Sequence, residues 1–149
     1  MNVSTILVPT DFSEDAARAL QTAIELAKKF DARIEVVHSY HVDMPIASPL
    51  GGGFVLPEGF LEGVRAHAER QVAKVVSEVS GQGLTIEGQA IEGSPSQVIV
   101  ATAKQCAADL IVMGTRGLTG LKHVALGSVA ERTIRTAPCP VLTVKADEN

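Results

Sequence analysis

Apolar positions along the chain alternate between two spacings, which predicts strands and helices in turn. The segment TILVPT (residues 5–10) is a short apolar run rich in β-branched residues, as expected of a buried strand. It precedes SEDAARALQTAIELAKKF (residues 13–30), in which apolar residues recur at the spacing of one helical face. The first predicted unit is therefore a strand followed by a helix.

The same alternation continues to the end of the chain. Further strands are predicted at residues 32–40, 84–93, 109–114 and 140–145; helices are predicted at 62–80, from Pro95 onward with Ser94 as N-cap, and at 128–136. Strands separated by helices need crossover connections, and right-handed crossovers give a parallel sheet with helices on both faces. We therefore predict one doubly wound, Rossmann-like α/β domain over residues 1–149, with a five-stranded parallel sheet.

In such a fold the ligand site is expected at the carboxyl ends of the strands, where the winding reverses. Three loops leave predicted strand ends there, after Thr10, after Ser39 and after Met113. Residues 40–60 contain three prolines and four glycines without periodicity, which predicts a long loop beside the crevice. This loop is either a lid or a surface excursion without function.

The segment MGTRGLTGLKHVALGSV, which begins at Met113, places four glycines between a predicted strand and a predicted helix. Glycine loses much backbone entropy on folding, so this density indicates that the backbone approaches something closely. A loop between a strand end and a helix N-terminus is a typical phosphate-binding position. The segment contains no Asp or Glu, and Arg116, Lys122 and Arg132 supply positive charge nearby. Phosphate binding is one interpretation of this loop.

A purely structural interpretation of the loop is also open. Ser128 and Glu131 match the S-x-x-E capping box, in which Ser128 as N-cap satisfies the helix amides without a ligand. The first helix begins with Glu14 and Asp15, which complement its dipole and repel a polyphosphate. Any phosphates are therefore expected near the later helix, which leaves Asp11 for the polar edge of a sugar or base.

Composition and missing motifs exclude several classes of protein. The net charge of −4 and the few aromatic residues (four Phe, one Tyr, no Trp) argue against a nucleic-acid-binding protein. The sequence contains neither a P-loop, nor G-x-G-x-x-G after the first strand, nor G-x-S-x-G. The N-terminal segment has a short apolar stretch without a charged leader, so we expect a soluble, cytoplasmic protein with no membrane partner.

The histidines and cysteines do not predict a metal site or a disulfide. His38 and His41 have the spacing H-x-x-H, but they lack a nearby set of carboxylate ligands, so no bound metal is expected from them. Cys106 and Cys139 lie far apart without C-x-x-C pairing. We expect both cysteines to be small apolar packing residues.

Taken together and in order, these segments closely resemble the ATP-binding branch of the universal stress protein family. The spacing Gly114-x2-Gly117-x9-Gly127-Ser128 follows DLIVMGTRG, while ILVPTDFSEDAARAL precedes it and SVAERTIRTAPCPVLTVK closes the pattern. The resemblance covers nearly the whole chain. It implies a five-stranded α/β fold, a homodimer and ATP held by the motif, with Mg²⁺ or Mn²⁺ bound through the phosphates as an option. Another branch lacks the glycine motif and does not bind ATP.

The resemblance also implies a set of nucleotide-binding positions. These are Pro9, Thr10, Asp11, Ser39, Met113, Gly114, Arg116, Gly117, Gly127, Ser128, Val129 and Ala130. The first three are expected around the nucleoside, with Asp11 as the polar contact, and Ser39 beside the adenine. The ribose and phosphate path is expected to follow Met113, Gly114, Arg116 and Gly117, and residues 127–130 are expected to form the phosphate pocket. Ala130 departs from the pattern because a hydroxyl residue can stand there, and the residue at position 116 varies in the family.

The sequence thus predicts a nucleotide-binding stress-response protein whose bound ATP sets its conformation or its partners. A slow ATPase is one alternative, although Asp11 is the single carboxylate near the predicted pocket, and the resemblance implies no catalytic residue. A nucleotide-free dimeric module, in which the glycine loop is only a turn, is the other. The strand that begins at Pro140 and ends at Lys145 is expected at the sheet edge, where it pairs across a two-fold axis in a homodimer.

Overall fold

The structure, a computed structural model, describes residues 2–42, 55–118 and 126–146. Its elements are β1 (Thr5–Pro9), α1 (Glu14–Phe30), β2 (Arg33–Tyr40), α2 (Phe60–Ser80), β3 (Ile86–Glu92), α3 (Pro95–Gln105), β4 (Leu110–Gly114), α4 (Ser128–Thr136) and β5 (Val141–Val144). Every predicted element is present, and the ends differ from the predicted ends by at most two residues. Most of the predicted loop at 40–60 falls on residues 43–54, which lie outside the described ranges.

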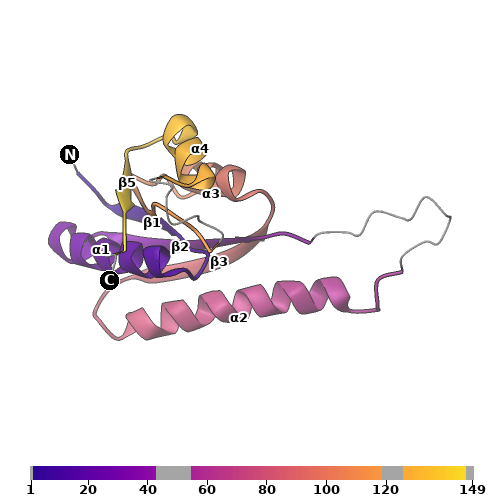
Figure 1. The fold of residues 1–149 in the computed structure, drawn as a ribbon. Coiled ribbons are helices and arrows are strands. Elements are labelled where there is room, and N and C mark those ends of the chain that lie inside the picture. The colour runs from indigo at the N-terminus through magenta and orange to yellow at the C-terminus, as the bar shows by residue number, and fades with distance from the viewer. Residues whose placement is uncertain (1, 43–54, 119–125, 147–149) are drawn as a thin grey trace.

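The five strands form one parallel sheet in the order β3-β2-β1-β4-β5. Helices α1 and α2 lie on one side of this sheet, and α3 and α4 lie on the other (Figure 1). The chain therefore builds outward from β1 to β3 and then returns to add β4 on the opposite side of β1. The predicted Rossmann-like α/β fold is confirmed, and its winding reverses between β1 and β4.

Two hydrophobic clusters cover the two faces of the sheet. Ile6 and Val8 of β1 belong to the cluster under α1 and α2, whereas Leu7 between them belongs to the cluster under α3 and α4. Side chains alternate between the two faces of a strand, so a strand buried on both faces must be apolar at every position. This is why the central strands appear in the sequence as continuous apolar runs.

Helix α1 has well-defined ends. The Ser13 side chain accepts a hydrogen bond from the amide of Ala16 at 3.3 Å, and Asp31 ends the helix in the left-handed conformation, with φ of 55°. The alanines of its inner face, among them Ala19 and Ala23, are fully buried and bring the helix close to the sheet. In the described ranges, no helix combines the length and the apolar character needed to cross a bilayer.

Helix α2 packs closely on β3 because position 88 has no side chain. A Cβ built at Gly88 would lie 2.6 Å from Val72 Cγ1 and 2.7 Å from Val76 Cγ2. Valine is stiff in a helix, because its branched Cβ leaves one favoured rotamer, so neither methyl group can swing away at low cost. A side chain at this position would push α2 off the edge strand.

We predict that Gly88→Ala lowers the free energy of unfolding by about 1–3 kcal/mol, the usual cost of overpacking a core contact. Gly63, within α2, is the matched control, since a Cβ built there meets no atom within 4 Å. Gly63→Ala should raise stability by about 0.5–1 kcal/mol, because alanine loses less backbone entropy in a helix. Urea unfolding of both variants measures the difference, and equal stabilities would contradict the close α2–β3 contact.

Candidate ligand-binding cleft

A cavity of about 490 Å³ opens at the carboxyl ends of β1 and β4, where the winding reverses. Its size falls within the range of about 300–1,000 Å³ that is usual for small-molecule sites. All the positions implied by the sequence resemblance line it, brought together from the ends of β1, β2 and β4 and the start of α4. Whether they contact a nucleotide remains a prediction.

Further residues line this cavity that the sequence analysis did not name. They are Ala16, Val37, Pro95, Ile99, Thr115 and Leu118. Val37 and Ile99 are buried members of the cluster between the sheet and α3 and α4, so their apolar spacing indicates only that they are core residues. Such residues form the floor of the cavity, and a strand or helix pattern does not distinguish the floor of a site from the rest of the core.

Asp11, which follows the carboxyl end of β1, holds the glycine-rich loop by a hydrogen bond. Its Oδ1 accepts a hydrogen bond from the amide of Ser13, and its Oδ2 accepts one from the amide of Leu118, each at 3.0 Å. A Cβ built at Gly117 would lie 2.5 Å from Asp11 Oδ2. Glycine at position 117 therefore allows the loop to rest directly on this carboxylate.

The other two motif glycines that the structure describes are also in close contact with protein atoms. A Cβ built at Gly114 would lie 2.7 Å from the Cβ and 2.9 Å from the carbonyl carbon of Asp15. At Gly127 the closest atom would be the carbonyl oxygen of Thr115, at 3.2 Å. Neither residue has a positive φ, so lack of space and not backbone conformation favours glycine, strongly at Gly114 and more weakly at Gly127. The glycines predicted that the loop backbone closely approaches something. In the structure, that close neighbour is the rest of the protein.

Asp15 is the residue of this region whose role the sequence analysis missed. It is 6% exposed, and its Oδ2 accepts hydrogen bonds from Thr115 Oγ1 at 2.9 Å and from the amide of Arg116 at 3.0 Å. Its Oδ1 accepts a hydrogen bond from the amide of Ala146 at 3.1 Å, and Arg116 Nε lies 3.5 Å from Oδ2. Asp15 thus joins the start of α1, the loop after β4 and the segment after β5.

The charge of Asp15 is stabilised in its buried position. Burial by itself would raise the pKa of Asp15, but the hydrogen bonds from Thr115, Ala146 and Arg116 outweigh it, together with the Arg116 charge. The pKa of Asp15 consequently lies below its ordinary value of 3.8. A signal for this role is present in the sequence, because Asp15 continues the buried face of Ala19 and Ala23 at four-residue spacing. A carboxylate on an apolar helix face needs partners from elsewhere in the fold.

The predicted capping box of α4 is wrong. Gly127 is the N-cap, and no side chain makes a cap hydrogen bond there, so Ser128 is the first helical residue. The box is out of register by one position, and Glu131 instead pairs with Arg135 at 2.9 Å. The exposed Ser128 hydroxyl has no hydrogen-bond partner recorded among the described residues. The first turn of α4 therefore faces the cavity without a side-chain cap.

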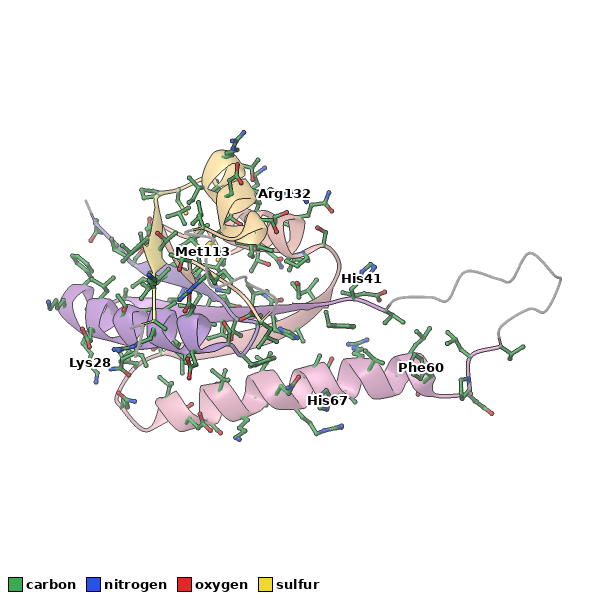
Figure 2. All side chains as sticks on the ribbon, viewed as in Figure 1. Lys28, His41, Phe60, His67, Met113 and Arg132 are labelled. Carbon is green, nitrogen blue, oxygen red and sulfur yellow. The ribbon has the colours of Figure 1, made fainter. Side chains whose placement is uncertain are left out.

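The three cations predicted near the loop are placed differently. Arg116 lines the cavity, and its side chain is 16% exposed. Arg132 of α4 (Figure 2) is exposed and is not among the residues that line the cavity. Met113 of β4 is buried and lines it. Lys122 lies outside the described residues. Arg116 is thus the cation that the described part of the chain brings to the cavity.

His38 supports the backbone that follows β1. Its Nδ1 lies 2.8 Å from the carbonyl oxygen of Thr10, which can only accept, so Nδ1 carries the proton. The His38 ring packs on Phe12 with the ring centroids 4.5 Å apart. Phe12 has φ of 64°, an uncommon conformation for a residue with a side chain. These contacts fix the backbone that carries Thr10 and Asp11.

The fold and the cavity define an open α/β protein with a concave site at its topological switch point. The chain belongs to the universal stress protein family, whose model matches residues 2–145. It is 41% identical over 140 residues to Universal stress protein MJ0531 of Methanocaldococcus jannaschii, which covers 94% of this chain and 81% of that protein.

Two solved structures show the same fold. Universal stress protein UspA from Lactobacillus plantarum is 26% identical with a TM-score of 0.78, covering 97% of this chain and 99% of that one. The universal stress protein from Archaeoglobus fulgidus in complex with dAMP is 28% identical with a TM-score of 0.65, covering 97% and 100% of the two chains.

We predict that Asp15→Asn lowers the free energy of unfolding at neutral pH by about 1–3 kcal/mol, because an amide cannot replace every bond to the carboxylate. Because the pKa of Asp15 is lowered on folding, the charged Asp15 stabilises the folded state at pH values above its ordinary pKa of 3.8. This contribution is lost as the pH falls through the lowered pKa. The difference in stability between wild type and variant should therefore shrink in acid. Urea unfolding at a series of pH values measures it.

Glu14→Gln is the control for this measurement, since Glu14 is an exposed carboxylate in the same helical turn. This change should cost little at any pH. A wild-type advantage over Asp15→Asn that stays constant down to strongly acidic pH would contradict the role given to the Asp15 charge.

Proposed function

We propose that the cavity binds an adenine nucleotide, ATP in particular, and that the protein is a nucleotide-dependent regulatory protein of the stress response. One observation carries this proposal. Asp11, from the N-terminal segment of the family pattern, and Gly127, from its glycine motif, line a single cavity of ligand size. The uncapped start of α4 forms one wall of this cavity.

The start of α4 offers the chemistry that a phosphate needs. The first amides of a helix have no partner within the helix and carry the positive end of its dipole. Because Gly127 is the N-cap, the first turn begins at Ser128, whose hydroxyl adds a donor beside these amides. Its side of the cavity also includes Val129 and Ala130, which offer backbone amides only. Phosphates are therefore proposed to lie against residues 127–130.

The apolar part of the cavity lining suits a base. Val37, Ile99 and Met113 provide apolar surface, and Ser39 adds polar backbone and a hydroxyl to the lining. The Archaeoglobus fulgidus relative was solved in complex with dAMP, which is an adenine nucleotide. Shared family and fold thus support adenine as the base.

The charges at the cavity favour binding over hydrolysis. Among the described lining residues, Asp11 and Arg116 are the charged ones, and Arg116 is already paired with Asp15. ATP brings several negative charges, so we propose that Mg²⁺ or Mn²⁺ accompanies it, bound through the phosphates. Hydrolysis needs a positioned base or water-orienting group. Both oxygens of Asp11 already accept backbone hydrogen bonds, so the proposed role is binding.

We predict that Gly127→Val abolishes measurable ATP binding, because a branched side chain would enter the phosphate wall next to the Thr115 carbonyl. Ser128→Ala should weaken ATP binding by roughly tenfold, since a hydrogen bond to a charged group is worth about 1.5–3 kcal/mol. Because Ser128 is not the cap, this variant should lose less than about 0.5 kcal/mol of stability. Calorimetric titration gives the affinities and urea unfolding the stabilities.

Wild-type affinity in Gly127→Val would show that the nucleotide, if bound, lies elsewhere. A stability loss in Ser128→Ala without a change in affinity would restore the capping interpretation. Mass spectrometry of gently purified protein separates the remaining alternatives, because co-purified ATP supports the proposal, ADP supports a slow ATPase, and no nucleotide supports a structural module.

We also propose a homodimer formed through β5. This strand is at one edge of the sheet, and Leu142 on it is 39% exposed. An edge strand with exposed apolar surface is a ready partner for a second copy. Pro140 stands before the strand, where a missing amide interrupts no pairing.

The expected result is a sedimenting species of about twice the chain mass of 15.6 kDa at micromolar concentration. Leu142→Lys should shift it to the monomer, because a charge on an edge strand opposes pairing. Phe30→Lys is the control, since Phe30 is 45% exposed at the end of α1 and is not part of the edge strand. A wild-type monomer would reject the proposed dimer.

A further inference from the structure

We propose that Asp15 is a positioning residue that couples the filling of the cavity to the ordering of the segment after β5, by which we mean Lys145 and Ala146. The inference rests on the proposed nucleotide binding. Asp15 itself does not line the cavity, whereas its partners Thr115 and Arg116 do. Any effect of Asp15 on a ligand therefore passes through these two residues.

The two carboxylate oxygens of Asp15 serve different parts of the chain. Oδ2 accepts hydrogen bonds from Thr115 Oγ1 and the Arg116 amide, and it also faces Arg116 Nε. Oδ1 accepts a hydrogen bond from the amide of Ala146, which is 9% exposed and follows the edge strand. One rigid planar group thus holds the cavity loop on one side and the segment after β5 on the other.

A second contact joins the same two segments by a different route. The amide of Thr115 donates to the carbonyl oxygen of Val144 at 2.9 Å, which continues the pairing of β4 with β5. This bond is made by the backbone and does not depend on Asp15. It therefore serves as an internal reference for the strand pairing, while the Ala146 amide reports on the carboxylate.

The coupling follows from the geometry of one carboxylate. When a ligand orders Thr115 and Arg116, their bonds to Oδ2 fix the orientation of the group, and this orientation presents Oδ1 to Ala146. The Ala146 bond then forms at a lower entropic cost, and the reverse must hold as well, because coupling between two sites is reciprocal. Nucleotide binding is thereby linked to the end of the edge strand.

Asparagine at position 15 separates the two tasks. It has nearly the same shape as aspartate but only one acceptor oxygen, and its other terminal group is an NH₂ donor. The donor must face either the Ala146 amide or the group of donors from Thr115 and Arg116. Asp15→Asn therefore breaks the link in either orientation. Glu14→Gln makes the same chemical change on an exposed carboxylate one residue away and leaves the link intact.

The test measures amide hydrogen exchange of Ala146 by NMR, with and without saturating ATP. In the wild type and in Glu14→Gln, ATP should slow exchange at Ala146 by about fivefold or more, the lower end of typical allosteric coupling. In Asp15→Asn, ATP should still bind but leave Ala146 exchange unchanged. The Thr115 amide, which is held by Val144, should remain protected in all three proteins and confirm that the fold is intact.

A second variant tests the reciprocal effect with Asp15 unchanged. Ala146→Pro removes the amide that Oδ1 accepts from, at a position outside the cavity, and should weaken ATP binding by about fivefold. Unaltered ATP affinity in this folded variant would overturn the coupling. So would an equal ATP effect on Ala146 in Asp15→Asn and in the wild type, or no effect in a wild type that binds ATP.

Failure of the proposed function gives a different result. If the wild type does not bind ATP, the nucleotide proposal is rejected, and exchange without ligand still decides the role of Asp15. Faster Ala146 exchange in Asp15→Asn than in Glu14→Gln would then support the link between Asp15 and the segment after β5. Equal exchange would overturn it.

Discussion

The first turn of α1 lies against the end of β4 because position 114 has no side chain. With less than 3 Å between the site of a Cβ at Gly114 and the Asp15 backbone, any other residue would push the helix away from the sheet. This single approach sets the position of Asp15, and Asp15 in turn holds the loop that follows β4. The cavity at the switch point owes its shape to this sequence of contacts.

The glycine-rich motif consequently has two tasks that are easily confused. At Gly114, Gly117 and Gly127, the space that a side chain would need is occupied by α1, by the Asp11 carboxylate and by the Thr115 carbonyl. The motif thus builds the cavity wall before any ligand is considered. Glycines that make room for a ligand and glycines that make room for other protein atoms give the same sequence. Only the distances from a built Cβ to its neighbours distinguish the two explanations.

The sequence predicts the fold well, because strand and helix spacings differ and the chain alternates between them without interruption. It also points to the edge of the sheet where the cavity opens, since the loops that follow parallel strands meet at one edge. It fails at Ser128, where an S-x-x-E pattern matches a capping box that the backbone places one residue earlier. It also fails at Asp15, because the usual preference for acidic residues in the first turn of a helix accounts for this residue equally well. The hydrogen-bond partners of Asp15 include Ala146, which is far away in the sequence. The first failure is a shift of one residue in where the helix begins, and the second concerns hydrogen bonds to segments distant in the sequence, which a local pattern does not contain.

The strand order has a consequence for how this protein comes to be folded. The cavity takes lining residues from the ends of β1 and β4 and from the start of α4, so the part of the chain that ends with β3 can form three strands but not the site. The pairing of β1 with β4 joins residues that are farther apart in the sequence than those of any other strand pair in the sheet. Contacts between residues distant in the sequence form slowly during folding. A molecule that binds in the cavity can recognise only chains in which both halves have docked, and by mass action it holds those halves together.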